Sequence, residues 1–332
     1  MDRRRLLALL GAAAASPAAS QGRADGLQVV VAGSSGPLPV RDRAKPCIAV
    51  LAQGGLYLVD VGPEATENLM LWRLPVDRAR AVFLTHMHSD HIGGLGEFNL
   101  QSWVAGRTAA VALVGPDGVD RVARGFNLAY EDDHRFRRAH HEHGAFKFSI
   151  AAGLIRPRVV RLRGRPTAVA WKDRDLSVTA IAVAHEPVVP AFAYRFDYKG
   201  RSVVVSGDTR KWQPLAEASR GADVLLHEAQ NDAMTRHMAQ GLSTMGNARM
   251  SSLITDTLTY HATPVEAAEI ARSAGVKRLV LYHLTQAGLP FYTAEAFTRG
   301  MEAGGPLDWR LARDGMTIDL PAGGSEIRFG QL

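Results

Sequence analysis

The chain has 332 residues, of which 46% are hydrophobic and 22% charged, the composition of an ordinary globular protein with material for a sizeable core. Its formal net charge of +6 makes it only mildly basic. The single cysteine, Cys47, excludes an intramolecular disulfide, and its apolar surroundings indicate a place in the core.

The first residues of the chain have the layout of an export signal. Three arginines at 3–5 precede the apolar run Leu6–Ala15, and small residues follow up to position 20. The arginine pair indicates the twin-arginine route. We therefore expect residues 1–20 to be a signal peptide and residues 21–332 to form a single domain of a periplasmic protein. We expect no stable membrane span, because the apolar run is shorter than the roughly 20 residues that a span needs.

Short apolar runs separated by glycine-containing turns predict two series of strands. The predicted strands are Leu27–Ala32, Ile48–Ala52, Leu56–Val61, Ala81–Thr85, Leu176–Ala184, Ala191–Tyr198, Ser202–Ser206, Val224–His227 and Leu279–His283. Residues 127–164 and 232–260 show no clear pattern, and lids or substrate walls are one interpretation of such segments.

One helix has clear start and stop signals. Thr263-Pro264-Val265-Glu266 is a capping box with proline at the first helical position, and Gly275 follows the last periodic residue. We expect a helix that ends at about Ala274, after which the chain returns as a strand that ends at His283.

A histidine-rich loop directly follows the predicted strand Ala81–Thr85. Residues 85–91 read Thr-His-Met-His-Ser-Asp-His. Neutral imidazole and carboxylate are ligands that zinc and neighbouring first-row metals favour, and four such groups within six residues can serve two ions. The candidate ligands in this loop are His86, His88, Asp90 and His91.

Three later residues occupy equivalent positions at the ends of predicted strands. His185 follows Leu176–Ala184, Asp208 lies in the turn after Ser202–Ser206, and His283 ends the last predicted strand. Each alone is unremarkable, since Gly-Asp-Thr is a common turn. Together they supply the additional ligands that a dinuclear centre needs.

These motifs resemble those of the metallo-β-lactamase-fold hydrolases, in the branch that contains ribonuclease Z and the zinc-dependent arylsulfatases. The resemblance covers roughly residues 28–320, and it implies an α/β protein with a four-layer αβ/βα sandwich. The matching motifs are Thr85–His91, Ala184-His185-Glu186, Ala193-Tyr194-Arg195, Ser206–Thr209, Leu226-His227-Glu228-Ala229, His261-Ala262-Thr263 and Leu281-Tyr282-His283.

The resemblance also implies a set of ligands for two metal ions. The ions are expected to be zinc, although manganese or iron could bind the same donors. The implied ligands are His86, His88 and His185 for the first ion, Asp90, His91 and His283 for the second, and Asp208 as the bridge. Two cations lower the pKa of a shared water, and the resulting hydroxide would attack an ester. Asp90 would also orient this hydroxide.

Further residues take their expected roles from the same resemblance. His261 would donate a proton to the leaving group, and Glu228 would hold its imidazolium in place. Asp60, at the end of a predicted strand, would hydrogen-bond to a ligand rather than bind metal itself.

The chain departs from ribonuclease Z in one place that bears on its substrate. Bacterial members have an inserted arm, between the positions of His185 and Asp208, that binds transfer RNA. Residues 186–207 of this chain have room only for two strands and a turn. We therefore expect nucleic acid not to be a partner. Seven arginines and lysines between Arg156 and Arg174 indicate either a solvated strand face or an electropositive rim that attracts an anionic substrate.

The leading functional hypothesis is a dinuclear hydrolase that cleaves a small anionic ester, an aryl sulfate or a phosphate ester. The alternatives are a lactonase or other carboxylic-ester hydrolase, a ribonuclease Z-like phosphodiesterase acting as an endonuclease, and a non-catalytic metal-binding protein. A homodimer is a further expectation by analogy with the family.

Overall fold

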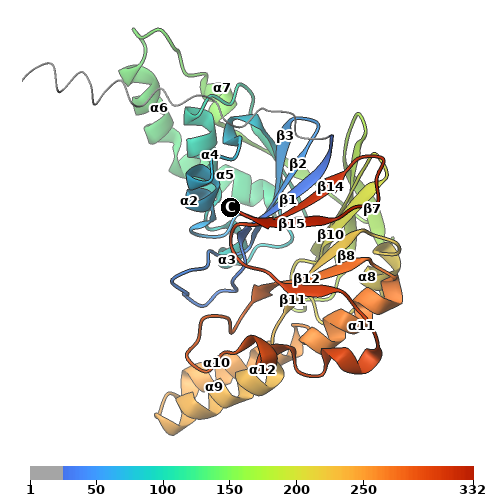
Figure 1. Cartoon of the computed structure of the whole chain (residues 1–332). Helices are drawn as coiled ribbons and strands as arrows, with labels where there is room; N and C mark the ends of the chain where they lie inside the picture. Colours follow the sequence, from blue (N-terminus) through green and yellow to red (C-terminus); the bar gives the residue numbers. More distant parts are fainter. Residues whose placement is uncertain (1–24) are drawn as a thin grey trace, which may run out of the picture.

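The computed structural model describes residues 25–332. The signal peptide expected at residues 1–20 lies outside this range. Within the described chain, two β-sheets lie face to face and helices cover their outer sides (Figure 1). This is the expected four-layer αβ/βα sandwich of the metallo-β-lactamase fold.

The first sheet has eight strands among the described residues, in the order β15-β14-β1-β2-β3-β4-β5-β6. Its strands are β1 (Gly26–Gly33), β2 (Cys47–Ala52), β3 (Gly55–Val59), β4 (Ala79–Phe83), β5 (Val111–Gly115), β6 (Ile155–Val159), β14 (Met316–Pro321) and β15 (Arg328–Gln331). Strands β3 to β6 run parallel, so their carboxyl ends meet at one edge.

The second sheet has seven strands in the described part of the chain, in the order β13-β12-β11-β10-β9-β8-β7. Its strands are β7 (Thr167–Asp173), β8 (Leu176–Val183), β9 (Ala191–Tyr198), β10 (Arg201–Val205), β11 (Val224–Ala229), β12 (Arg278–Leu284) and β13 (Trp309–Leu311). Strands β10 to β13 are parallel, and β8 runs in the same direction because β9 is antiparallel to both β8 and β10.

Helices form the two outer layers. Their bounds are α2 (Ala65–Leu71), α3 (Ser89–Ile92), α4 (Leu95–Val104), α5 (Val119–Ala129), α6 (Glu131–His140), α7 (Ile150–Gly153), α8 (Gln213–Ala218), α9 (Asp232–Thr244), α10 (Ala248–Asp256), α11 (Pro264–Ala274) and α12 (Ala294–Thr298), with 3-10 turns at Val76–Arg78, Thr257–Thr259 and Met301–Gly304. Apolar side chains of α2, α4 and α5 pack on the first sheet, and those of α8 and α11 pack on the second.

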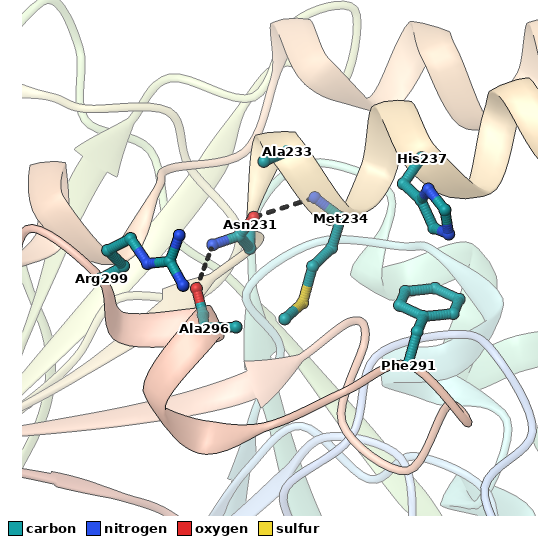
Figure 2. A pocket seen from close by; sticks show the side chains of 7 residues that line it. All are labelled: Asn231, Ala233, Met234, His237, Phe291, Ala296 and Arg299. Carbon is teal, nitrogen blue, oxygen red and sulfur yellow. Dashed lines mark hydrogen bonds between the residues drawn. The ribbon is translucent and has the colours of Figure 1, made fainter.

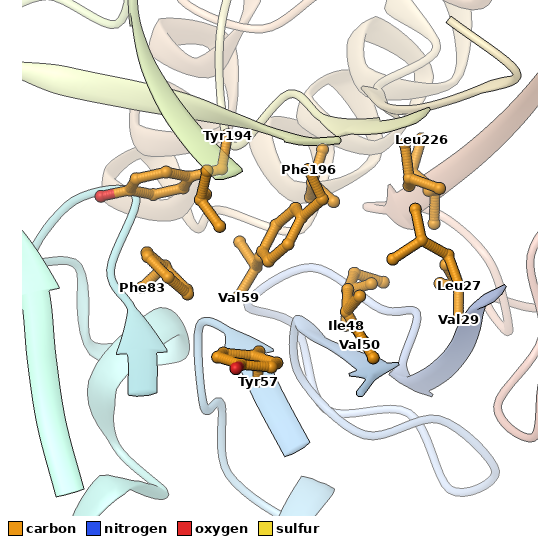
Figure 3. Close-up of a cluster of buried hydrophobic side chains, with 14 of the residues drawn as sticks. Leu27, Val29, Ile48, Val50, Tyr57, Val59, Phe83, Tyr194, Phe196 and Leu226 are labelled. Carbon is orange, nitrogen blue, oxygen red and sulfur yellow. The ribbon is translucent and has the colours of Figure 1, made fainter. Parts of the chain in front are cut away.

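The main core lies between the sheets (Figure 3). Phe83 of β4 contacts two aromatic residues of β9, with ring centroids 5.2 Å from Tyr194 and 5.4 Å from Phe196. Branched side chains of β1 and β2, such as Val29 and Ile48, fill the other half of the interface. Strands β4, β8 and β10, which lead to the candidate site, also contribute side chains to this core, so their carboxyl ends are held on a rigid support.

The predicted strands and the capped helix are confirmed, with bounds that shift by a few residues. Thr263 accepts a hydrogen bond from the backbone of Glu266 and begins α11, and Gly275 ends it with a left-handed φ of 61°.

The two segments without a clear pattern both contain helices. Residues 127–164 contain α6, α7 and β6, and residues 232–260 contain α9 and α10. Helix α10 buries none of its residues, and α6 buries one, His134. Because most of their side chains are exposed, no buried apolar face marks these helices in the sequence. Between residues 25 and 332, no helix is both long and apolar enough to cross a membrane.

Candidate metal centre

The histidine-rich loop leaves β4 at the edge where the parallel strands of the first sheet end. Thr85, His86 and His91 are buried, whereas His88 is exposed and begins the short helix α3. His86 Nε2 lies 2.8 Å from His88 Nδ1, and His185 Nε2, delivered by β8 of the second sheet, lies 3.4 Å from the same atom. The structure thus brings together three histidines from two sheets.

Asp208 lies at the centre of the cluster. Its Oδ2 atom is 3.4 Å from Nε2 of both His91 and His283, and 3.9 Å from Nε2 of both His86 and His185. One carboxylate oxygen therefore faces four imidazoles. This is the position that a carboxylate shared by two cations would occupy.

Asp90 completes the second half of the cluster. Its Oδ2 atom lies 3.5 Å from His91 Nε2 and 3.4 Å from His283 Nε2. All seven candidate ligands are therefore in one place, although they come from β4, β8, β10 and β12. Among the described residues, three groups have donor atoms within 4.8 Å of one another: His86, His88, His185 and Asp208; Asp90, His91 and His283; and Asp208, His261 and His283.

Unpartnered buried atoms indicate that the cluster suits a cation. His91 Nε2, His283 Nε2 and Asp208 Oδ1 are inaccessible to solvent and have no hydrogen-bond partner among the described residues. Buried polar atoms are nearly always paired, so such groups need another partner. Imidazole nitrogens and carboxylate oxygens with free lone pairs are the donors that zinc, manganese and iron bind.

The charge state of the histidines agrees with this. Burial lowers the pKa of His86, His88 and His185, which keeps these imidazoles neutral and able to donate a lone pair. Burial alone would also lower the pKa of His91, but the carboxylates of Asp208 and Asp60 outweigh it and raise this pKa. The Asp208 side of the cluster thus attracts positive charge.

Asp60 supports the cluster from behind. Its Oδ2 atom lies 2.8 Å from His91 Nδ1, and its two oxygens accept hydrogen bonds from the backbone N–H and the hydroxyl of Thr85, both at 2.8 Å. Asp60 therefore fixes the ring of His91 and leaves Nε2 directed at Asp208. The expected place of Asp60 outside the ligand set agrees with these contacts.

His261 and Glu228 form a pair beside the cluster. His261 Nδ1 lies 2.8 Å from Glu228 Oε1, and the same oxygen accepts a hydrogen bond from the backbone N–H of Thr209 at 3.0 Å. Burial alone would lower the pKa of His261, but the Glu228 carboxylate outweighs it and raises this pKa to about 9. The ring of His261 stacks 5.7 Å from that of His283, so its charge is held next to the candidate ligands.

Gly207 and Tyr282 hold Asp208 in place, and the sequence motifs gave no role to either. Gly207 adopts φ +61°, and a Cβ there would lie 2.7 Å from the carbonyl oxygen of Phe192 and 2.8 Å from Cβ of Thr85. Its backbone N–H donates a hydrogen bond to the Tyr282 hydroxyl at 3.1 Å. This close approach of the turn to Thr85 brings Asp208 up to the histidine loop, and only glycine fits there.

A separate cavity of about 400 Å³ lies beside the start of α9 (Figure 2). Its lining residues are Asn231, Ala233, Met234, His237, Phe291, Ala296 and Arg299. The Asn231 side chain caps α9 and donates a hydrogen bond to the Ala296 carbonyl, so its amide group already has hydrogen-bond partners within the protein. None of the candidate ligands lines this cavity.

Comparison with known proteins agrees with the fold. The family described as beta-lactamase superfamily domain matches residues 56–284. The metallo-beta-lactamase fold protein YhfI from Bacillus subtilis superposes with a TM-score of 0.62 at 18% identity, over 89% of this chain and 100% of that one. The short form of human tRNase Z gives a TM-score of 0.60 at 21% identity, over 89% and 99%.

Sequence relatives define the branch more closely. A protein named Ribonuclease Z from Mycobacterium bovis (strain BCG / Pasteur 1173P2) is 31% identical over 265 residues, which are 79% of this chain and 87% of that protein. Another of that name, from Mycobacterium sp. (strain KMS), is 29% identical over 306 residues, 90% of this chain and all of the relative. The fold and the site thus define a hydrolase of the metallo-β-lactamase superfamily. Within it, the chain belongs to the ribonuclease Z family.

This relationship corrects the expectation that nucleic acid is not a partner. That expectation rested on the missing arm and on the expected export of the protein, and residues 186–207 do hold only the β9–β10 hairpin and its flanking turns. The relatives are nonetheless named Ribonuclease Z, and this chain matches 87% and 100% of their lengths. The inference was wrong because a surface insertion can differ between relatives while the buried centre that does the chemistry stays the same.

The expected periplasmic location is contradicted as well, since the relatives are named Ribonuclease Z and RNA is made inside the cell. The aryl sulfate specificity of the leading hypothesis has no support among the relatives described here.

Proposed function

We propose that this protein is a metal-dependent phosphodiesterase that cleaves RNA. The observation that carries the proposal is the position of Asp208, whose single oxygen faces four imidazoles with the His261–Glu228 pair alongside. The names of the sequence relatives supply the substrate class.

We assign the candidate ligands to two cation sites, for which two zinc ions are the first choice. His86, His88 and His185 would hold one ion, Asp90, His91 and His283 would hold the other, and Asp208 would bind between them. Cations bound there would activate water and offset the negative charge of a phosphodiester.

Asp90 is suited to a second task. Its side chain is 12% exposed, whereas those of His91 and His283 are fully buried, so Asp90 is the carboxylate at the solvent side of this group. From there it accepts a hydrogen bond from the attacking water and directs the water's lone pair at phosphorus.

His261 is suited to protonate the leaving oxygen. An alkoxide leaves RNA poorly, and a protonated imidazole beside the centre can donate the proton it needs. Glu228 keeps the ring protonated and oriented, since its oxygen is fixed by Thr209 as well.

Two substrates test the proposal, each with protein loaded with zinc or with manganese. One is a transfer RNA with a 3′ extension, and the other is bis(p-nitrophenyl) phosphate. We expect wild type to cleave both, and His88→Ala and Asp208→Ala to cleave neither. Turnover of an aryl sulfate or a lactone without any cleavage of RNA would contradict the proposal.

A further inference from the structure

A basic loop, residues 160–166, joins the two sheets at the end that carries the candidate metal centre. Strand β6 is parallel to β4, so its carboxyl end lies at the edge where His86 begins. Strand β7 is antiparallel to β8, so its first residue, Thr167, pairs with Ile181 near the end that leads to His185.

The loop is fixed at both ends. Val160 donates a backbone hydrogen bond to Gly115, and Ala182 donates one to Pro166, both at 2.8 Å. Leu162 packs against the core between the sheets. The three arginines that alternate with these anchored positions are exposed: Arg161, Arg163 and Arg165.

The spacing of strands puts this loop close to the centre. Neighbouring strands lie about 4.8 Å apart, β6 is two strands from β4, and β7 is next to β8. The loop therefore starts roughly 5 to 10 Å to the side of the strands that deliver His86 and His185. This is the reach of one or two nucleotides of backbone.

The charge of the segment has one sign. Every charged residue from Ile155 to Lys172 is a lysine or an arginine. One acidic contact is present, Asp117 at 3.1 Å from Arg161, and both side chains of that pair are more than half exposed. Exposed pairs of this kind are weak, so Arg161 remains free to exchange partners.

We infer that Arg161, Arg163 and Arg165 form a phosphate-binding rim that holds the RNA backbone beside the metal centre. This inference rests on the proposed function. A guanidinium binds phosphate through two parallel N–H groups, so three arginines on one loop suit successive phosphates of a strand. The rim would replace part of the grip that an arm supplies, and it would bind RNA of any sequence.

Another explanation for the same arginines is protection of sheet edges. Strands β6 and β7 are the last strands of their sheets, and charged side chains discourage edge-to-edge pairing. That explanation applies equally to both ends of these strands. The rim applies only to the end next to the metal centre.

A pair of triple variants separates the two explanations. The rim variant combines Arg161→Gln, Arg163→Gln and Arg165→Gln. The control combines Arg156→Gln, Lys172→Gln and Arg174→Gln, which remove three exposed charges at the opposite ends of β6 and β7. Both are compared with wild type as metal-loaded protein, for the KM with RNA at several salt concentrations and for the turnover of bis(p-nitrophenyl) phosphate.

We expect the rim variant to raise the KM for RNA about 10-fold or more. The slope of log KM against log salt concentration should fall by the equivalent of about two to three phosphate contacts. Turnover of the small diester should stay within about 2-fold of wild type in both variants, which also shows that they fold. The control should leave the KM for RNA nearly unchanged. An equal rise in both variants, or none in either, would overturn the inference while RNA cleavage by wild type still supports the proposed function. A wild type that cleaves only the small diester would overturn both.

Discussion

The Nδ1 atom of His261 and the Oε1 atom of Glu228 lie 2.8 Å apart, and the same Glu228 oxygen accepts the backbone N–H of Thr209, the residue after Asp208. A single carboxylate thus connects the candidate proton donor to the turn that carries the central candidate ligand. Glu228 of β11 therefore contacts both parts of the candidate site.

Glu228→Gln should therefore slow RNA cleavage more than it slows hydrolysis of an activated ester. The neutral amide no longer stabilises the imidazolium, and we expect kcat for RNA to fall about 100-fold, within the usual range for loss of general acid catalysis. Nitrophenolate leaves without a proton, so kcat for bis(p-nitrophenyl) phosphate should fall less than about 5-fold. Equal losses of kcat on both substrates would mean that Glu228 maintains the structure of the site and does not support proton donation by His261.

Asp60→Ala should weaken metal binding without removing a ligand. The variant loses the hydrogen bond that orients His91, and losses of this kind cost about 10- to 100-fold in metal affinity. Competition with a chromophoric chelator would measure this. Asp197→Ala, which removes a half-exposed carboxylate bound to Arg195, should leave the affinity unchanged.

Gly207→Ala should destabilise the turn that presents Asp208. The added Cβ would meet Phe192 and Thr85 at under 3 Å in a left-handed conformation, and we expect a cost of about 2 kcal/mol or more in unfolding free energy. Gly221→Ala is the matched control, because Gly221 has φ +65° but open space around it, so it should cost only about 1 kcal/mol. Urea denaturation of both variants checks the difference.

Asp223 should contribute to stability in a pH-dependent way. Burial alone would raise its pKa, but hydrogen bonds from Lys277, Ser202 and Arg201 outweigh it and lower this pKa. A lowered pKa in the folded state stabilises the protein above the unfolded value of about 3.9, and this contribution is lost as the pH falls through the folded pKa.

Asp223→Ala should therefore cost about 3 kcal/mol at pH 7, because it leaves the buried Arg201 without its carboxylate. The deficit relative to wild type should shrink below about pH 4. Asp308→Ala, which breaks a largely exposed pair with Arg278, should cost under about 1 kcal/mol. A deficit that is the same at pH 7 and at pH 3 would contradict the assignment of Asp223.

Much of the fold and the ligand positions could be predicted because their signals are local. Buried parallel strands such as β4 and β12 are nearly continuous apolar runs, and the candidate ligands His86 and His283 lie close to the ends of these runs. Helix α11 carries its own start and stop residues.

Other features depend on contacts between distant residues. Helix α6 carries pairs such as Arg137 with Asp133 at 2.8 Å, and only Phe136 and Ala139 among its residues are apolar. The close approach of Gly207 to Thr85 joins residues of different sheets, and no pattern within either segment predicts it. A ribonuclease Z-like phosphodiesterase was among the alternatives from the sequence, but the expectation that nucleic acid is not a partner was wrong. An absent insertion says nothing about the chemistry of a buried cluster.

Metal content measured together with RNA cleavage, for wild type and Asp208→Ala, tests the central proposal most directly. We expect about two metal ions per chain in wild type with cleavage of the extended transfer RNA, and loss of both bound metal and cleavage in the variant. A wild type with two bound ions that leaves RNA intact, or an Asp208→Ala variant that still cleaves it, would contradict the account.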